Sequence, residues 1–155
     1  MEKKAFSCYA ITNNLRIEGN TRDGLKLLPC CIYKGKKIYN SYQEYISSSE
    51  LATLKNSENW PEGCSICEKQ ESLGQRSYRI DCENWFKNSP AKQRIEVFPS
   101  NICNLKCFMC GPKASTAWAK ENFDVTNQGR EFIEEFNSVD KIIEIINQVQ
   151  DLKEI

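Results

Sequence analysis

Three cysteines on one short segment constrain this 155-residue chain more than any other feature. Cys103, Cys107 and Cys110 have the spacing C-x3-C-x2-C, and they follow a strand-like run at residues 94–98. A loop with this spacing can turn its sulfur atoms toward a common centre, and cysteine thiolates are the usual ligands of iron–sulfur clusters. Three thiolates leave one iron of a four-iron cluster without a protein ligand. The segment therefore predicts a 4Fe-4S cluster with an iron open to chemistry.

A zinc knuckle or three plain buried thiols are the structural alternatives for these cysteines. Zinc prefers C-x2-C pairs completed by a second pair or by histidines, and the chain contains no histidine. The missing histidines also remove the commonest general base and the Cys-His and Ser-His pairs. We therefore favour the cluster over zinc at this segment and do not expect acid–base hydrolysis.

The C-x3-C-x2-C segment resembles the signature of the radical S-adenosylmethionine (radical SAM) superfamily. In that family the three cysteines hold a 4Fe-4S cluster, and S-adenosyl-L-methionine chelates the remaining iron. The reduced cluster cleaves this cofactor to a 5'-deoxyadenosyl radical, which abstracts hydrogen from a substrate. The resemblance places Met109 and Asn101 at the cofactor. Met109 stands before the third cysteine, where the family usually has an aromatic residue near the adenine, and the aromatic Phe108 lies one place earlier.

Composition and charge set weaker limits on partners and location. Lys plus Arg and Asp plus Glu number 21 each, so no global charge favours nucleic acid or a membrane. The lysines among residues 34–37 are expected to form a solvated surface. The N-terminus lacks an apolar signal region and no run approaches a membrane span. We therefore expect a cytoplasmic protein without membrane or nucleic-acid partners, whose nine cysteines have metal or redox roles.

A second cysteine pair, Cys64 and Cys67, has the C-x2-C spacing and follows a turn at residues 60–63. Such a pair is compact enough to clasp one metal centre, but it needs ligands from elsewhere in the chain. The available candidates are Cys8 and either Cys30 or Cys31, because adjacent side chains rarely reach one centre equally well.

The sequence around these cysteines follows a longer pattern. It consists of Phe-x-Cys, a hairpin with a glycine in its turn, Pro-Cys-Cys and then Gly-Cys-x2-Cys-Glu-x5-Gly-x2-Ser-x-Arg. The last part falls on Gly63, Cys64, Cys67, Glu68, Gly74, Ser77 and Arg79. The pattern resembles the twitch or SPASM-type auxiliary-cluster module of many radical SAM enzymes. That resemblance implies a second iron–sulfur cluster held by Cys8, Cys30, Cys64 and Cys67, with Cys31 as the alternative to Cys30; an all-thiolate zinc site on the same residues is the other alternative.

The first half of the chain predicts a hairpin and short helices. Apolar residues alternate on both sides of an Asn/Asp/Gly-rich connection at residues 19–24, which favours a β-hairpin within residues 6–31. Ser41 and Glu44 match a capping box that opens a helix, and residues 47–50 offer a second helix start.

The second half predicts a further helix, a strand and two more helices. Apolar side chains recur at helical spacing from Ser77, and Cys82 on that face is expected to be a core thiol. Residues 95–98 predict a strand, residues 114–119 lie in a helical stretch, and residues 124–130 are expected to be a polar loop. The last helix is expected to present one apolar face, formed by Val139, Ile142, Ile143, Ile146 and Val149.

Together these features predict an α+β fold in two regions. Residues 1–90 would form the twitch/SPASM-like module of a Cys-rich hairpin and helices, and residues 91–155 would begin a radical SAM (β/α) barrel. A barrel of this kind needs roughly 200 residues or more, and the family's Gly-Gly-Glu segment is missing because no two glycines are adjacent. The barrel is thus expected to be incomplete, as in a fragment, a split enzyme completed by a second chain, or a degenerate protein without catalysis. An open strand also predicts an exposed apolar patch.

The resulting functional hypothesis is the N-terminal part of a radical SAM enzyme that modifies a peptide or small-molecule substrate. No residue of the chain is assigned as a catalytic acid, base or radical relay. The alternatives are a zinc-stabilised interaction module, in which all seven ligand cysteines are structural, and a cluster-binding adaptor without turnover.

Overall fold

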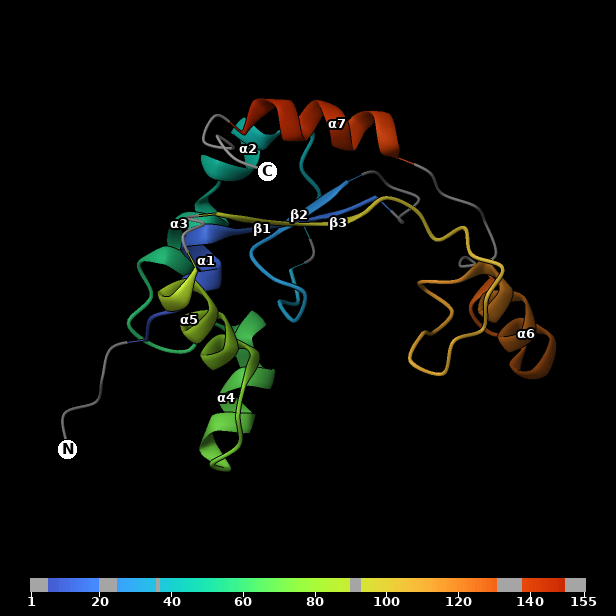
Figure 1. Ribbon diagram of the computed structural model, residues 1–155, viewed down its shortest axis with the longest axis horizontal. Coiled ribbons are helices and arrows are strands. Elements are labelled where there is room, and N and C mark those ends of the chain that lie inside the picture. Colours follow the sequence, from blue (N-terminus) through green and yellow to red (C-terminus); the bar gives the residue numbers. More distant parts are fainter. Residues whose placement is uncertain (1–5, 20–24, 36, 90–92, 131–137, 150–155) are drawn as a thin grey trace.

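A three-stranded sheet with the order β2-β1-β3 forms the centre of the computed structural model (Figure 1). The structure describes residues 6–19, 25–35, 37–89, 93–130 and 138–149. Strand β1 (Asn14–Glu18) pairs antiparallel with β2 (Lys26–Leu28) and parallel with β3 (Arg94–Phe98). The fold is therefore mixed α+β, as the sequence predicts.

Helices lie on both sides of the sheet (Figure 1), and serine side chains mark where four of the described helices begin. Within the described residues the helices are α1 (Tyr9–Asn13), α2 (Tyr42–Ile46), α3 (Ser49–Lys55), the 3-10 helix η1 (Glu62–Cys64), α4 (Ser65–Ser72), α5 (Tyr78–Asn88), α6 (Thr116–Thr126) and α7 (Val139–Gln148). The hydroxyl oxygens of Ser41, Ser48, Ser77 and Ser115 each accept a hydrogen bond from the backbone N–H three residues later. Such a cap satisfies an N–H group that has no partner within the helix, which is why α2, α3, α5 and α6 begin at these positions.

The hydrophobic core lies between the sheet and the helices. Side chains alternate along β1, so Leu15 and Ile17 are buried while Arg16 points to the other face. Leu15 and Ile17 belong to one buried cluster with Ile142 and Ile145 of α7. Helices α7 and α2 lie on one side of the sheet, and α1, α4 and α5 lie on the other (Figure 1).

The expected hairpin is confirmed as β1 and β2, but its start was predicted wrongly. Residues 9–13 form the short helix α1 rather than extended chain. Side chains of Thr12 and Asn13 both donate to the Tyr9 carbonyl oxygen at 3.1 Å within this helical turn. Residues 20–24, within the expected turn, lie outside the described residues.

The last two helices are confirmed with corrections. Helix α6 extends through Thr126, so the expected polar loop starts later than residue 124. In α7 the buried side chains are Ile142 and Ile145, with Val149 just beyond the helix and Ile146 packed against the core. The expected face was partly wrong, because Val139 and Ile143 are 43% and 50% exposed.

Strand β3 and helix α7 complete the core that the earlier part of the chain begins. The parallel pairing places Leu15 of β1 opposite Ile95 of β3. Ile11 of α1 and Ile142 of α7 belong to the same hydrophobic cluster. The two predicted regions therefore share one sheet and one core. In the described part of the chain, no helix combines the length and apolar character needed to span a bilayer.

Candidate metal centres

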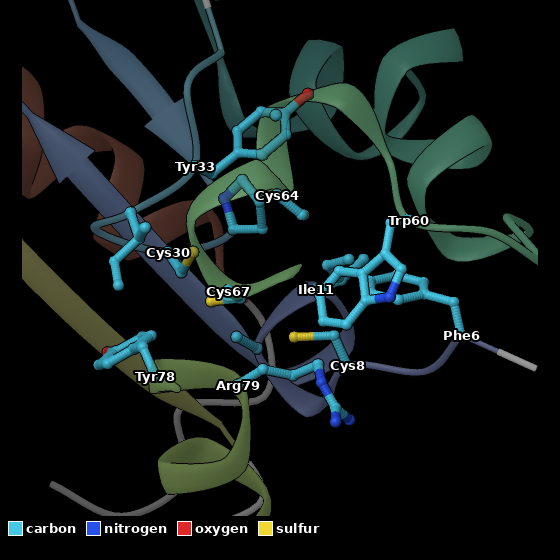
Figure 2. A pocket seen from close by; sticks show the side chains of 14 residues that line it. Phe6, Cys8, Ile11, Cys30, Tyr33, Trp60, Cys64, Cys67, Tyr78 and Arg79 are labelled. Carbon is cyan, nitrogen blue, oxygen red and sulfur yellow. The ribbon is translucent and has the colours of Figure 1, made fainter. Parts of the chain in front are cut away.

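Four cysteines from three segments of the chain line one pocket. Cys8 precedes α1, Cys30 follows β2, Cys64 ends η1, and Cys67 lies in the first turn of α4. Figure 2 shows the sulfur atoms of Cys8, Cys30 and Cys67 turned toward the shared interior. The structure thus brings together the four residues that the sequence resemblance assigned to one metal centre.

The rest of the pocket wall is largely apolar and aromatic. The rings of Phe6 and Trp60 lie 5.0 Å apart at its rim, and Tyr33 and Tyr78 contribute to other walls (Figure 2). Arg79 also lines the pocket. Sequence reasoning missed the three aromatic residues Tyr33, Trp60 and Tyr78 as part of the site, because aromatic residues are more often found in ordinary cores.

Burial opposes ionisation of the pocket thiols. It raises the pKa of Cys8, although the backbone N–H groups of Ala10 and Ile11 and the Arg79 cation act in the opposite direction. Burial also raises the pKa of Cys30 to about 12 and that of Cys64 to about 12, and nearby thiols add to both effects. Four neighbouring thiolates need positive charge to balance them, which a metal ion or cluster would supply.

The pocket does not contain a preformed coordination shell. Within the described residues, no group of three or more Cys, Asp, Glu or His side chains is arranged to hold a metal ion. All nine cysteines lie in the described segments, and all are free thiols. The donor set is chemically suited to a metal, and binding would require its sulfur atoms to move closer together.

The two remaining N-terminal cysteines lie outside this pocket. Cys31 is exposed and is not among the pocket's lining residues. Partial desolvation of its sulfur and the neighbouring Glu96 carboxylate raise its pKa, while Tyr78 and Arg16 act in the opposite direction. Cys82 is buried within α5, as expected for a core thiol. Of the adjacent pair, Cys30 is thus the cysteine that faces the other three.

Several residues of the longer sequence pattern have clear structural roles around the pocket. A Cβ atom at Gly63 would overlap the ring of Tyr33, so only glycine fits beside Cys64. Gly74 has a φ of 69° after the end of α4, in the left-handed region that glycine favours. Ser77 caps α5, and its hydroxyl also donates to Glu71 at 2.5 Å.

The C-x3-C-x2-C loop lies beside α6, away from the sheet (Figure 1). The carbonyl oxygen of Cys103 accepts hydrogen bonds from the Ser115 hydroxyl at 3.2 Å and from the Ala117 N–H at 3.1 Å. The indole N–H of Trp118 donates to the carbonyl oxygen of Cys107 at 3.0 Å. The first turn of α6 therefore holds the loop backbone, while the side chains of Cys107 and Cys110 are exposed.

The two residues expected at the cofactor occupy different environments. Met109 is 95% exposed and Phe108 is fully exposed at the tip of the loop, beside the cysteines. Asn101 is 2% exposed at the base of the loop, where its carbonyl oxygen accepts from the Thr116 N–H at 3.0 Å. Leu105 is also exposed, so the loop presents an apolar surface.

Comparison of the chain with protein-family models, with curated proteins and with solved structures found no match. The class that fold and site define is a mixed α+β protein with a four-cysteine pocket and a separate three-cysteine loop.

Proposed function

We propose that this chain is an iron–sulfur protein of the radical SAM type. The observation that carries the proposal is the convergence of Cys8, Cys30, Cys64 and Cys67 on one pocket. Soft thiolate donor sets select iron–sulfur clusters or zinc over harder metals. In this proposal the four residues hold an auxiliary iron–sulfur cluster in a twitch/SPASM-like module.

The second cluster of the proposal is bound by Cys103, Cys107 and Cys110. Support comes from the order of strand β3, cysteine loop and helix α6, which is that of a β/α unit. We propose that this unit begins a radical SAM barrel, with β3 at the edge of the described sheet available to a following strand. Further sequence or a second chain would supply the other strands.

The residues around the loop have separate parts in this proposal. Trp118 and Ser115 hold the loop carbonyl groups, so the three thiols are presented from a fixed backbone. The exposed Phe108 and Met109 would pack against S-adenosyl-L-methionine or against the remaining barrel. When bound, the cluster and this cofactor would supply hydrogen abstraction from a peptide or small-molecule substrate.

A structural zinc site is the second candidate function, for the pocket alone. Four cysteines without another ligand type are a common structural zinc set. In that case the pocket would stabilise an interaction module and carry no redox chemistry.

The decisive experiment is to measure iron, sulfide and zinc after anaerobic purification and reconstitution. Two full clusters would give about eight irons per chain. Cys107→Ala should remove about half of the iron and Cys64→Ala the other half, because the two ligand sets are separate. Cys82→Ala is the matched control and should keep all of it. Zinc with little iron would refute the radical SAM proposal.

A further inference from the structure

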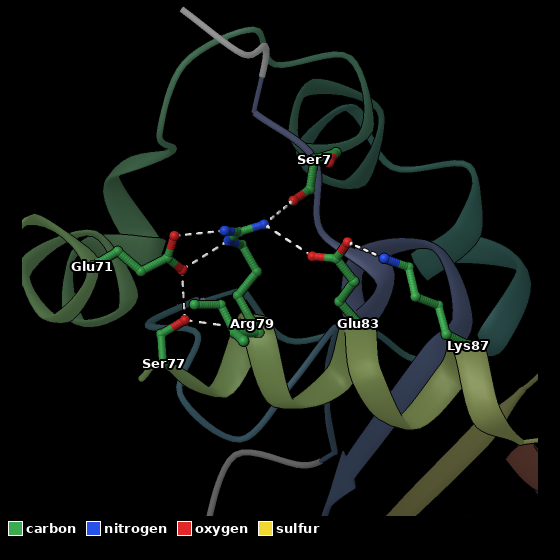
Figure 3. Close-up of polar contacts among 7 residues, drawn as sticks. Ser7, Glu71, Ser77, Arg79, Glu83 and Lys87 are labelled. Atoms are coloured by element: carbon green, nitrogen blue, oxygen red, sulfur yellow. Dashed lines mark hydrogen bonds and ion pairs between the residues drawn. The ribbon is translucent and has the colours of Figure 1, made fainter. Parts of the chain in front are cut away.

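Arg79 connects the two segments that carry Cys8 and Cys67. Its Nη1 donates to the carbonyl oxygen of Ser7 at 3.0 Å, one residue before Cys8 (Figure 3). Its Nε and Nη2 donate to the two carboxylate oxygens of Glu71 at 2.8 and 2.5 Å. Glu71 lies on α4 four residues after Cys67, and residues at this spacing share a helix face.

This connection is more than a surface ion pair. The side chains of Arg79 and Glu71 are each only 19% exposed. The Arg79 hydrogen bonds lower the pKa of Glu71, and the Ser77 hydroxyl contributes in the same direction. Glu83 lies 3.8 Å from the guanidinium, on the same helix (Figure 3).

The shape of the guanidinium group matters at this position. Its planar fork binds a carboxylate through two hydrogen bonds and leaves a third donor for the Ser7 carbonyl. The Cζ atom of Arg79 also lies 5.5 Å from the centre of the Trp60 ring, at the rim of the pocket. A lysine ammonium is a point charge and cannot reproduce this set of contacts.

We propose that Arg79 is a positioning residue for the four-cysteine metal centre. It holds the Cys8 segment against α4, so that Cys8 and Cys67 are kept on the same pocket. Because the coordination shell is not preformed in the described residues, the affinity for metal depends on how closely these segments are already held. The inference rests on the proposed function in one respect, namely that the pocket binds metal.

The test is a Co²⁺ titration of the chain in which Cys103, Cys107 and Cys110 are replaced by alanine. Only the pocket then offers a thiolate set, and Co²⁺ bound to thiolates absorbs in the visible and near-ultraviolet, whether the natural metal is iron or zinc. Substitution of outer-shell groups typically weakens metal binding about 10- to 100-fold. We expect a loss of that size for Arg79→Lys.

Arg76→Lys is the matched control, since Arg76 precedes the same helix and pairs with Asp81 at an exposed site. It should leave Co²⁺ affinity unchanged. The thiolate-to-cobalt absorption band of Arg79→Lys should also shift, because one cysteine ligand is less well placed. A purely global loss of stability would not change the position of this band. Thermal unfolding of the metal-free variants checks that they fold.

Glu71→Gln provides a second, independent variant. It removes the charge that Arg79 binds and should also weaken Co²⁺ binding. If Arg79→Lys does not fold, the Co²⁺ affinity of Glu71→Gln tests the positioning role instead. Affinities equal to that of the Arg76→Lys control in the folded variants would overturn the positioning role while leaving the metal centre intact. If the parent protein shows no thiolate-to-cobalt absorption, the metal centre itself is refuted and the positioning role with it.

Discussion

Gly63→Ala tests whether the segment that carries Cys64 is packed as tightly as the structure shows. A Cβ atom at this position would overlap the ring of Tyr33, so the ring must move. That ring cannot move freely, because its hydroxyl donates to Glu50 at 2.8 Å. Overpacking of this kind destabilises a protein by about 1–3 kcal/mol, and loss of the hydrogen bond to the carboxylate would add roughly 1.5–3 kcal/mol.

The assay is urea unfolding of the reduced, metal-free chain. Gly111→Ala is the matched control, because a Cβ atom there meets nothing within 4 Å, and it should change the free energy of unfolding by less than about 0.5 kcal/mol. In a Tyr33→Ala background the clash is gone, so Gly63→Ala should then cost less than about 0.5 kcal/mol. The coupling energy is then at least about 0.5 kcal/mol from overpacking alone, and about 2 kcal/mol or more if the hydrogen bond is also lost. Equal effects of Gly63→Ala in both backgrounds would refute the packing argument.

Two further predictions concern α6 and α5. Ser115→Ala removes the cap of α6 and the donor to the Leu105 carbonyl oxygen at 2.7 Å. It should destabilise the first turn by about 1 kcal/mol, measured as faster amide hydrogen exchange there; unchanged exchange would contradict this. Burial raises the pKa of Cys82 to about 11 from an ordinary 9.0, so the folded state keeps a proton that the unfolded state loses. Stability should therefore fall as the pH rises from about 9 through 11, and Cys82→Ala should reduce this slope in pH-dependent urea unfolding; the same slope in both proteins would contradict the assignment.

Local side-chain chemistry explains why much of the secondary structure could be predicted. The serine caps at Ser41, Ser48 and Ser77 act within one turn of each helix, so their signal is present in a few residues. The buried face of α7 depends on tertiary context instead. Its isoleucines form two overlapping stripes, and only the position of the sheet decides that Ile145 is buried and Ile143 exposed.

The parallel pairing of β1 with β3 is the feature that sequence patterns could least reveal. It joins segments far apart in the chain, and the Arg16 to Glu96 ion pair at 3.2 Å spans 80 residues. Nothing local in either strand specifies this neighbour. The charged side chains of β1 and β3 that this pairing brings together cannot be recognised as neighbours from either strand alone.

For the candidate metal centre, spacing was informative only where the ligands are close in sequence. The C-x2-C pair was evident, but the choice between Cys30 and Cys31 depends on how the chain leaves β2. Glu71 was missed as the partner of Arg79. Its position four residues after Cys67 is a signal that could have found it, but we did not predict the helix α4 that places both residues on one face.

The shared core makes a prediction about the division at residue 90. A fragment of residues 1–90 would keep the four pocket cysteines but lose β3 and α7. Ile142, Ile145 and Val149 are 3%, 2% and 6% exposed in the whole chain. The fragment lacks them and would expose the apolar side chains that pack against them. Burial of such side chains contributes roughly 1.5–3 kcal/mol each, about 5–9 kcal/mol together, which is comparable to the total stability of about 5–15 kcal/mol of an ordinary domain.

We therefore expect the 1–90 fragment not to fold without metal, as measured by urea unfolding and by the dispersion of its amide NMR signals. A polar contact supports the same expectation. The Tyr78 hydroxyl donates at 2.6 Å to Glu96 of β3, while Tyr78 also lines the four-cysteine pocket. A cooperative unfolding transition of the metal-free fragment would show that the pocket belongs to an independent domain. Its absence would mean that the four-cysteine pocket and the strand leading to the cysteine loop form one folding unit.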